Sequence, residues 1–168
     1  MEIRNLSPTY TLRKLEKEDV DIIYDLSCKN TIFYQYHPPF VTKESIHEDM
    51  EALPPGKTYA DKFYIGFFSG DTLAAVMDLI LDYPRENIAF IGLFMMNMDL
   101  QGRGVGTAII QDCAAHLAAM GYEKIQLGID QGNPQSEAFW TKNGFRFTGR
   151  KILNGFSAYL YMERELSA

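Results

Sequence analysis

A glycine-rich turn is the part of this sequence whose residue types and spacing most directly suggest chemistry. It separates the apolar run 88–98 from the amphipathic stretch 105–120, so it joins an expected strand to an expected helix. Glycines let the backbone approach an anion closely, and the first N–H groups of a helix are free to donate, with the helix dipole behind them. The turn therefore predicts a phosphate-binding site made of Gln101, Gly102, Arg103, Gly104, Val105, Gly106 and Thr107.

Two common phosphate-binding motifs do not fit this turn. A P-loop requires a lysine followed by serine or threonine after its last glycine, whereas Gly106 is followed directly by Thr107. A Rossmann fingerprint has the spacing G-x-G-x-x-G, usually in the first strand–helix unit, whereas this turn has G-x-G-x-G and follows a run of antiparallel strands. The spacing that remains is Gln-x-x-Gly-x-Gly.

The elements that position the turn follow from hydrophobic periodicity and from helix and turn signals. Helices are expected at residues 16–28, 43–53, 105–120 and 134–143. Strands are expected at residues 10–15, 62–69, 72–81, 88–98, 124–129, 146–151 and 157–163. Between the first two helices, the aromatic segment 30–41 ends in Pro38 and Pro39, which predicts an irregular connector without helix.

Length, composition and charge narrow the class of protein. The 168 residues, of which 46% are hydrophobic, predict one compact domain over residues 1–168. A net charge of -6 argues against nucleic acid or an anionic membrane as partner and favours a cationic substrate. No run approaches the roughly 20 apolar residues of a membrane span, and Cys28 and Cys113 stand apart from any C-x-x-C pair. We therefore expect a soluble cytoplasmic protein with two unpaired thiols.

A second signature lies downstream of the turn. Residues 133–145 read Asn-Pro-Gln-Ser-Glu-Ala-Phe-Trp-Thr-Lys-Asn-Gly-Phe, in which an asparagine opens a helix that ends in aromatic-x-Lys-x-Gly-Phe. With Gln-x-x-Gly-x-Gly at 101–106 and the order of elements, the chain resembles the GNAT N-acetyltransferase family over nearly its whole length. The resemblance implies an α+β fold with a central mixed, mostly antiparallel sheet, splayed between its fourth and fifth strands and flanked by helices.

The resemblance also implies that acetyl-coenzyme A is the acyl donor. The turn would hold the pyrophosphate, strand backbone would pair with the pantetheine arm, and an N–H near Met96 would polarise the thioester carbonyl. The asparagine that opens the second signature matches the family residue that contacts coenzyme A, and it is equally an N-cap followed by proline. Met95 and Met96 also suit a core. The implied donor contacts are the seven residues of the turn together with Phe94, Met95, Met96, Asn133 and Trp140.

Trp140 departs from the family pattern. Many members place there a tyrosine that protonates the leaving thiolate, a role that an indole N–H does not fill. The proton then comes from another group or from water, which a thiolate with a reference pKa of about 8.5 tolerates as a leaving group. Packing against the pantetheine or the core is the other reading of Trp140.

Removing a proton from the acceptor requires a base, because an alkyl amine with a pKa near 10 arrives protonated. Asp78 is the first candidate, because it interrupts the apolar strand 73–81, where a carboxylate has a raised pKa or holds a cation. Asp130 follows strand 124–129, at the expected splay. Tyr159 and Tyr161, which alternation places on one face of the last strand, are candidate proton donors.

The aromatic connector borders the acceptor cleft in this family, so we expect it to select the substrate. Tyr36 and His37 are its candidate contacts, together with Asp130, and His37 suits either substrate binding or proton relay. His47 and His116 lie on expected helices without an H-E-x-x-H partner, so we expect no metal site.

These observations predict an N-acetyltransferase that moves the acetyl group of acetyl-coenzyme A to a primary amine of a small molecule or peptide. No nucleophilic residue stands out, so the amine is expected to attack directly within a ternary complex. The alternative is an acyl-coenzyme A binding module or sensor with little or no turnover. The expected partners are the amine acceptor, without nucleic acid or membrane, and the final strand pair leaves a homodimer open.

Overall fold

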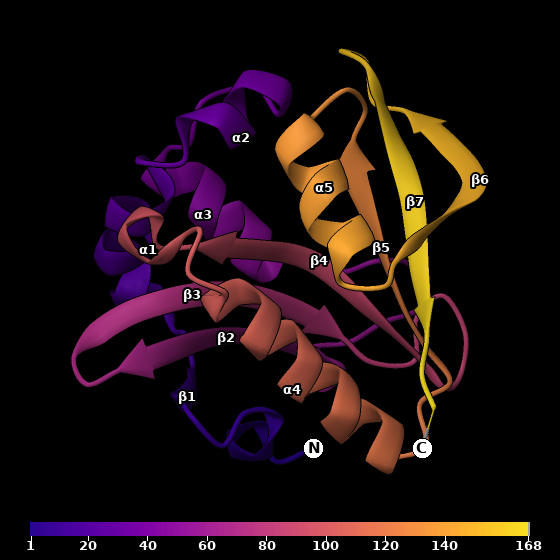
Figure 1. Cartoon of the computed structure of the whole chain (residues 1–168). Helices are drawn as coiled ribbons and strands as arrows, with labels where there is room; N and C mark the ends of the chain where they lie inside the picture. The colour runs from indigo at the N-terminus through magenta and orange to yellow at the C-terminus, as the bar shows by residue number, and fades with distance from the viewer. Residues whose placement is uncertain (168) are drawn as a thin grey trace.

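A computed structural model describes residues 1–167 as a single seven-stranded sheet in the order β1-β2-β3-β4-β5-β7-β6 (Figure 1). Only β4 and β5 pair in parallel, and all other neighbours are antiparallel. The predicted fold class, a mixed and mostly antiparallel sheet flanked by helices, is therefore confirmed. The strands are β1 (Thr11–Lys14), β2 (Lys62–Ser69), β3 (Thr72–Ile80), β4 (Ile88–Met96), β5 (Lys124–Asp130), β6 (Arg146–Leu153) and β7 (Ala158–Glu165).

The helices agree with the prediction except in the N-terminal half. Residues 16–28 form a 3₁₀ turn before the α-helix begins, and the connector predicted to be irregular contains a helix at 31–36. That prediction was wrong because Pro38 restricts the residue before it, His37, and leaves the preceding turn free to be helical. The helices are η1 (Ile3–Leu6), η2 (Lys17–Asp19), α1 (Val20–Ser27), α2 (Thr31–Tyr36), α3 (Lys43–Glu51), η3 (Met98–Leu100), α4 (Val105–Ala119) and α5 (Pro134–Lys142).

Each face of the sheet carries its own hydrophobic core. On one face, β3 and β5 pack against α4, which contributes Ile109, Cys113 and Leu117, and against Trp140 of α5. On the other face, β2 and β3 pack against α1 and α3, which contribute Ile23 and Ile46. Figure 1 shows α1, α2 and α3 gathered at one side and α4 lying across the sheet in front of β2 and β3. The C-terminal ends of β4 and β5 therefore lie between α1, α2 and α3 on one side and α4 and α5 on the other (Figure 1).

The sheet opens between β4 and β5 at one end. The two strands pair only from Ile88 with Lys124 to Ile91 with Leu127. Directly beyond this ladder β4 contains a bulge, because Asp78 pairs with Leu93 and Leu79 with Ile91, which leaves Gly92 as an extra residue. A bulge bends its strand, and Figure 1 shows β4 and β5 diverging from a common end. The bulge therefore accounts for the predicted splay.

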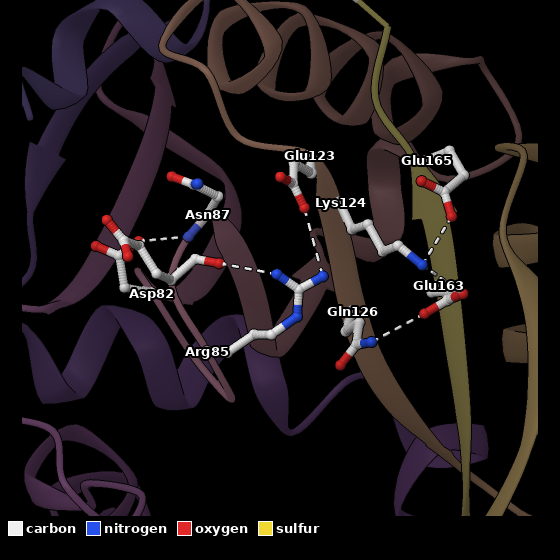
Figure 2. Close-up of polar contacts among 9 residues, drawn as sticks. Asp82, Arg85, Asn87, Glu123, Lys124, Gln126, Glu163 and Glu165 are labelled. Atoms are coloured by element: carbon white, nitrogen blue, oxygen red, sulfur yellow. Dashed lines mark hydrogen bonds and ion pairs between the residues drawn. The ribbon is translucent and has the colours of Figure 1, made fainter.

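Polar contacts hold the opposite end of these strands together. Figure 2 shows Lys124 at the start of β5 between Glu163 and Glu165 of β7, at 3.1 and 2.8 Å. Arg85, in the turn before β4, reaches Glu123 before β5 at 3.4 Å. Each of these partly exposed pairs contributes little stability alone, but together they link the turn before β4 with β5 and β7. The contact of Arg85 with Glu123 and the parallel ladder thus keep β4 and β5 together at this end, whereas Lys124 ties β5 to β7.

The bulge generates a testable prediction. A Cβ atom on Gly92 would lie 2.8 Å from Oδ2 of Asp78, and the same oxygen forms a buried ion pair with Lys62 at 2.8 Å. Gly92→Ala must shift this pair and is expected to lower the free energy of unfolding by about 1–3 kcal/mol, measured by urea denaturation.

Gly128→Ala is the matched control on the facing strand. Its Cβ atom would meet Tyr159 at an ordinary 3.7 Å, so we expect a change below about 1 kcal/mol. Equal losses in the two variants would contradict the close approach at the bulge.

Candidate active site

A cavity of about 370 Å³ lies where β4 leaves β5, between the glycine-rich turn and α5. The structure brings together here all the predicted donor contacts except Arg103 and Val105. Arg103 is exposed, and Val105, the first residue of α4, packs against the core. The predicted residues that line the cavity are Phe94, Met95, Met96, Gln101, Gly102, Gly104, Gly106, Thr107, Asn133 and Trp140.

The glycines of the turn serve two different purposes. Gly102 and Gly104 have φ angles of 73° and 78°, in the left-handed region that favours glycine. Gly104 is the N-cap of α4, and its carbonyl accepts the first helical hydrogen bond, from Ala108 at 2.9 Å. The N–H groups of residues 105–107, which precede this first bond, thus have no helical partner and point out of the start of α4. Gly106 instead permits close packing, because a Cβ atom there would lie 3.1 Å from Phe139.

The free edge of β4 turns toward the cavity backbone groups that are not paired with a neighbouring strand. Ala75 and Met96 are opposite each other in the β3–β4 ladder, and the N–H of Asn97 bonds to the carbonyl of Ala74 at 2.8 Å. This pattern makes Ala75 and Met96 a non-hydrogen-bonded pair, so the N–H and C=O of Met96 point away from β3. The same holds two residues earlier for Phe94, which pairs with Met77. Because β5 has already diverged, these groups face the gap.

Asn30 is a buried polar residue of the site that the sequence reasoning missed. Its amide donates to the carbonyls of Leu26 and Met96, both at 3.0 Å, and its own carbonyl accepts from Gln101 at 2.9 Å. Gln101 in turn accepts from Gln135 of α5 at 3.4 Å. A chain of amides therefore joins the end of α1, the edge of β4, the turn and α5. No local pattern marks Asn30 as part of the site, because its partners there, Met96 and Gln101, lie far away in sequence.

Asn133 and Trp140 both take the structural roles that were predicted as alternatives. Oδ1 of Asn133 caps α5 by accepting from the N–H groups of Gln135 and Ser136 at 3.1 and 3.2 Å. Trp140 is 7% exposed and packs edge-to-face on Phe139 and Phe145, both with ring centroids 5.0 Å away. Both residues also line the cavity, so their contact with a donor stays a prediction.

The residues predicted for the acceptor meet on the side of the cavity nearest α2. Nδ1 of His37 lies 3.1 Å from both carboxylate oxygens of Asp130, although 93 residues separate them in the chain. The hydrogen bond with Asp130 raises the pKa of His37 above its usual 6.5. Tyr36 lies beside Gly132, where a Cβ atom would be 4.0 Å from its ring. The sequence placed these residues in one cleft but did not predict the pair.

Asp78 shows both predicted situations, because it holds a cation and has a raised pKa. Its Oδ2 pairs with Nζ of Lys62 at 2.8 Å, while its Oδ1 is buried without any hydrogen-bond partner among residues 1–167. Burial raises the pKa of the Asp78 carboxyl, and Lys62 opposes that rise. The sequence did not single out Asp49 of α3, whose carboxyl pKa is also raised by burial, while the charges of His37 and Lys62 lower it. The role of Asp78 as base stays a prediction.

Tyr159 and Tyr161 lie on one face of β7, as the alternation indicated. They pair with Asp130 and Gly128 of β5, and the ring of Tyr159 is 6.1 Å from that of His37. Burial raises the pKa of Tyr159. Tyr161 lies farther along the strand, beneath the guanidinium of Arg150 at 4.5 Å. Neither tyrosine lines the donor cavity, and their role as proton donors stays a prediction.

Residues 1–167 contain neither a cluster of metal ligands nor a membrane-spanning helix. No three His, Cys, Asp or Glu side chains are gathered in a way that would hold a metal ion. No helix in this part of the chain combines the length and apolar character needed to cross a membrane.

The chain is similar to several N-acetyltransferases. An uncharacterized N-acetyltransferase of Methanocaldococcus jannaschii is 25% identical over 148 residues, which make up 86% of this chain and 64% of that protein. The chain therefore spans less than two thirds of this relative's length. The crystal structure of an acetyltransferase from Thermus thermophilus superposes with a TM-score of 0.72 at 22% identity, covering 94% of this chain and 97% of that one.

A structure of spermidine N-acetyltransferase from Vibrio cholerae, in complex with coenzyme A and spermine, also shares the fold. It has a TM-score of 0.67 at 19% identity, and the match covers 94% of this chain and 96% of that one. The sequence profile of the acetyltransferase (GNAT) family matches residues 22–145, which include the whole of β4, the glycine-rich turn, β5 and α5. The match covers most of the chain and confirms the resemblance seen in the sequence: the chain belongs to the GNAT acetyltransferase family.

Proposed function

We propose that this protein transfers the acetyl group of acetyl-coenzyme A to a primary amine of a small molecule or peptide, within a single domain. The observation that carries the proposal is the unpaired edge of β4 beside the open start of α4. One extended ligand can use both, by adding to the strand along one part and placing an anion at the helix start with another. A pantetheine arm with a pyrophosphate has this shape and chemistry.

The backbone of β4 supports a specific binding position for acetyl-coenzyme A. The side-chain amide of Asn30 donates a hydrogen bond to the carbonyl of Met96. The N–H of Met96 and the N–H and C=O of Phe94 have no hydrogen-bond partner among residues 1–167. A pantetheine amide can pair with Phe94, and the N–H of Met96 is then a donor for the thioester oxygen as negative charge develops on it. Lys142 lines the same cavity and supplies positive charge for phosphate.

The acceptor side suits a cationic amine. Asp49, Asp78 and Asp130 bring three carboxyl groups to the sheet face opposite α4, where Lys62 and His37 balance them only in part. Such a surface favours an ammonium over an anionic or neutral acceptor. The Vibrio cholerae structure with spermine is an example within the same fold of a protein that binds a polyamine.

The packing of Trp140 favours a second candidate function, an acyl-coenzyme A binding module or sensor. Its ring is enclosed by Phe94, Phe139 and Phe145, so this position offers no acid for the leaving thiolate. Both functions require coenzyme A binding, and they differ in whether thiol is released when an amine is supplied.

Release of thiol from acetyl-coenzyme A should therefore depend on an added amine. We expect turnover with one or more members of a panel of polyamines, amino acids, aminoglycosides and peptides with free N-termini, and mass spectrometry should find the acetylated amine. Tight binding of acetyl-coenzyme A with no thiol release across the panel would favour the binding module and contradict the proposal that the protein is an enzyme.

The second prediction concerns the helix-start anion site. Gly104→Asp places at the start of α4 a carboxylate that competes with the pyrophosphate for the same N–H groups and repels it, so we expect calorimetry to show acetyl-coenzyme A affinity reduced about tenfold or more. Gly104→Ala is the control, because it forces the same left-handed backbone without the charge and should lose less. Unchanged affinity in Gly104→Asp would contradict the proposal that this turn binds the pyrophosphate.

A further inference from the structure

The ring of His37 is held at the boundary between the donor cavity and the acidic face of the sheet. It stacks on Phe33, with centroids 5.1 Å apart, and Phe33 lines the donor cavity. Its partner Asp130 ends β5, three residues before Asn133, which lines the same cavity. We propose that His37, oriented by Asp130, accepts the proton of the acceptor amine. This inference rests on the proposed transferase function.

The hydrogen bond to Asp130 determines which ring nitrogen is free. An ionised carboxylate only accepts hydrogen bonds, so Nδ1 of His37 must carry the hydrogen that both oxygens of Asp130 receive at 3.1 Å. In the neutral imidazole the lone pair is then on Nε2. No protein group in residues 1–167 forms a hydrogen bond with Nε2. The pair therefore presents a free proton acceptor.

Exposure separates the two members of the pair. The side chain of Asp130 is 6% exposed, whereas that of His37 is 40% exposed. A buried carboxylate that holds a more accessible imidazole is the arrangement that orients a histidine base and stabilises its protonated form. Asp78 offers less, because its Oδ2 is bonded to Lys62 and its Oδ1 is enclosed.

The groups around His37 favour uptake of a proton. Asp130 faces it from β5, Asp49 from α3 and Tyr159 from β7, and its own helix contributes the ring of Phe33. Both carboxyl groups raise the pKa of His37, while partial burial lowers it, and the hydrogen bond with Asp130 is the largest influence. Since no lysine or arginine is among these groups, the imidazolium is stabilised where it forms.

The proposed step balances as follows. An acceptor ammonium gives one proton to Nε2 of His37, and the neutral nitrogen attacks the thioester carbonyl carbon. A C–N bond forms, the C–S bond breaks, and a second nitrogen proton passes to the departing thiolate. The products are the acetylated amine, coenzyme A thiol and imidazolium, which returns its proton to solvent.

The first test is a pH titration of the ¹⁵N-histidine-labelled protein by NMR, which needs no acceptor. We expect neutral His37 to carry its hydrogen on Nδ1 and to titrate above the reference value of about 6.5. Asp130→Asn should move the midpoint to lower pH. His47→Gln and His116→Gln identify the other two resonances. A neutral form with hydrogen on Nε2, or one midpoint for both proteins, would overturn the pairing.

The second test is the pH dependence of acetyl transfer to an alkyl amine found in the panel. Because that amine stays protonated up to about pH 10, the rising limb of kcat/KM should follow the titration of His37 and move to lower pH in Asp130→Asn. His37→Gln should lose about 10²- to 10⁴-fold in kcat/KM and keep its affinity for acetyl-coenzyme A. His47→Gln, on α3, should behave as wild type.

The outcomes distinguish this proposal from the proposed function. Full activity and an unchanged rising limb in His37→Gln would overturn the role of His37 and leave the transferase intact. Binding of acetyl-coenzyme A with no acceptor acetylated would overturn the proposed transferase function. The role of His37 as base would then fall as well, whatever the NMR titration shows.

Discussion

The separation of β4 from β5 beyond Gly92 is the constraint on which the site depends. Backbone N–H and C=O groups inside a sheet need partners, and here a strand in the middle of the sheet loses its neighbour over its last residues. The bulge at Gly92 bends β4 away, while the parallel ladder and the contact of Arg85 with Glu123 hold the other end closed. The resulting edge lies inside the molecule, which makes it the surface proposed to bind one extended ligand.

The two sides of this opening differ in whether backbone groups or side chains line them. The side proposed for the donor consists mainly of backbone, from β4 and from the start of α4, and the amide chain of Asn30 connects these parts. The side proposed for the acceptor consists of side chains from α2, α3, β5 and β7, with Asp49, Asp78 and Asp130 supplying its charge. Backbone recognition suits a donor common to a family, whereas scattered side chains allow each member its own acceptor.

Much of this architecture could be predicted because its signals are local. Periodicity located the strands, and the glycine-rich turn located the helix start, since left-handed φ angles at Gly102 and Gly104 demand glycine. The helix at 31–36 was missed because the effect of Pro38 reaches only the residue before it. A glycine within the apolar strand β4 was an available sign of the bulge. Asn30 and Asp49 carried no sign, because both act through residues distant in sequence.

The sequence by itself determined the family, the fold class and the place of the glycine-rich turn, since each depends on periodicity, on backbone conformation or on contiguous motifs. Only the tertiary structure decided which of the residues predicted for the acceptor meet. It paired His37 with Asp130 and Asp78 with Lys62, and it enclosed Trp140 among aromatic rings. These choices depend on how the strands diverge and how α2 packs over the opening. Long-range packing of this kind leaves no pattern in a single sequence.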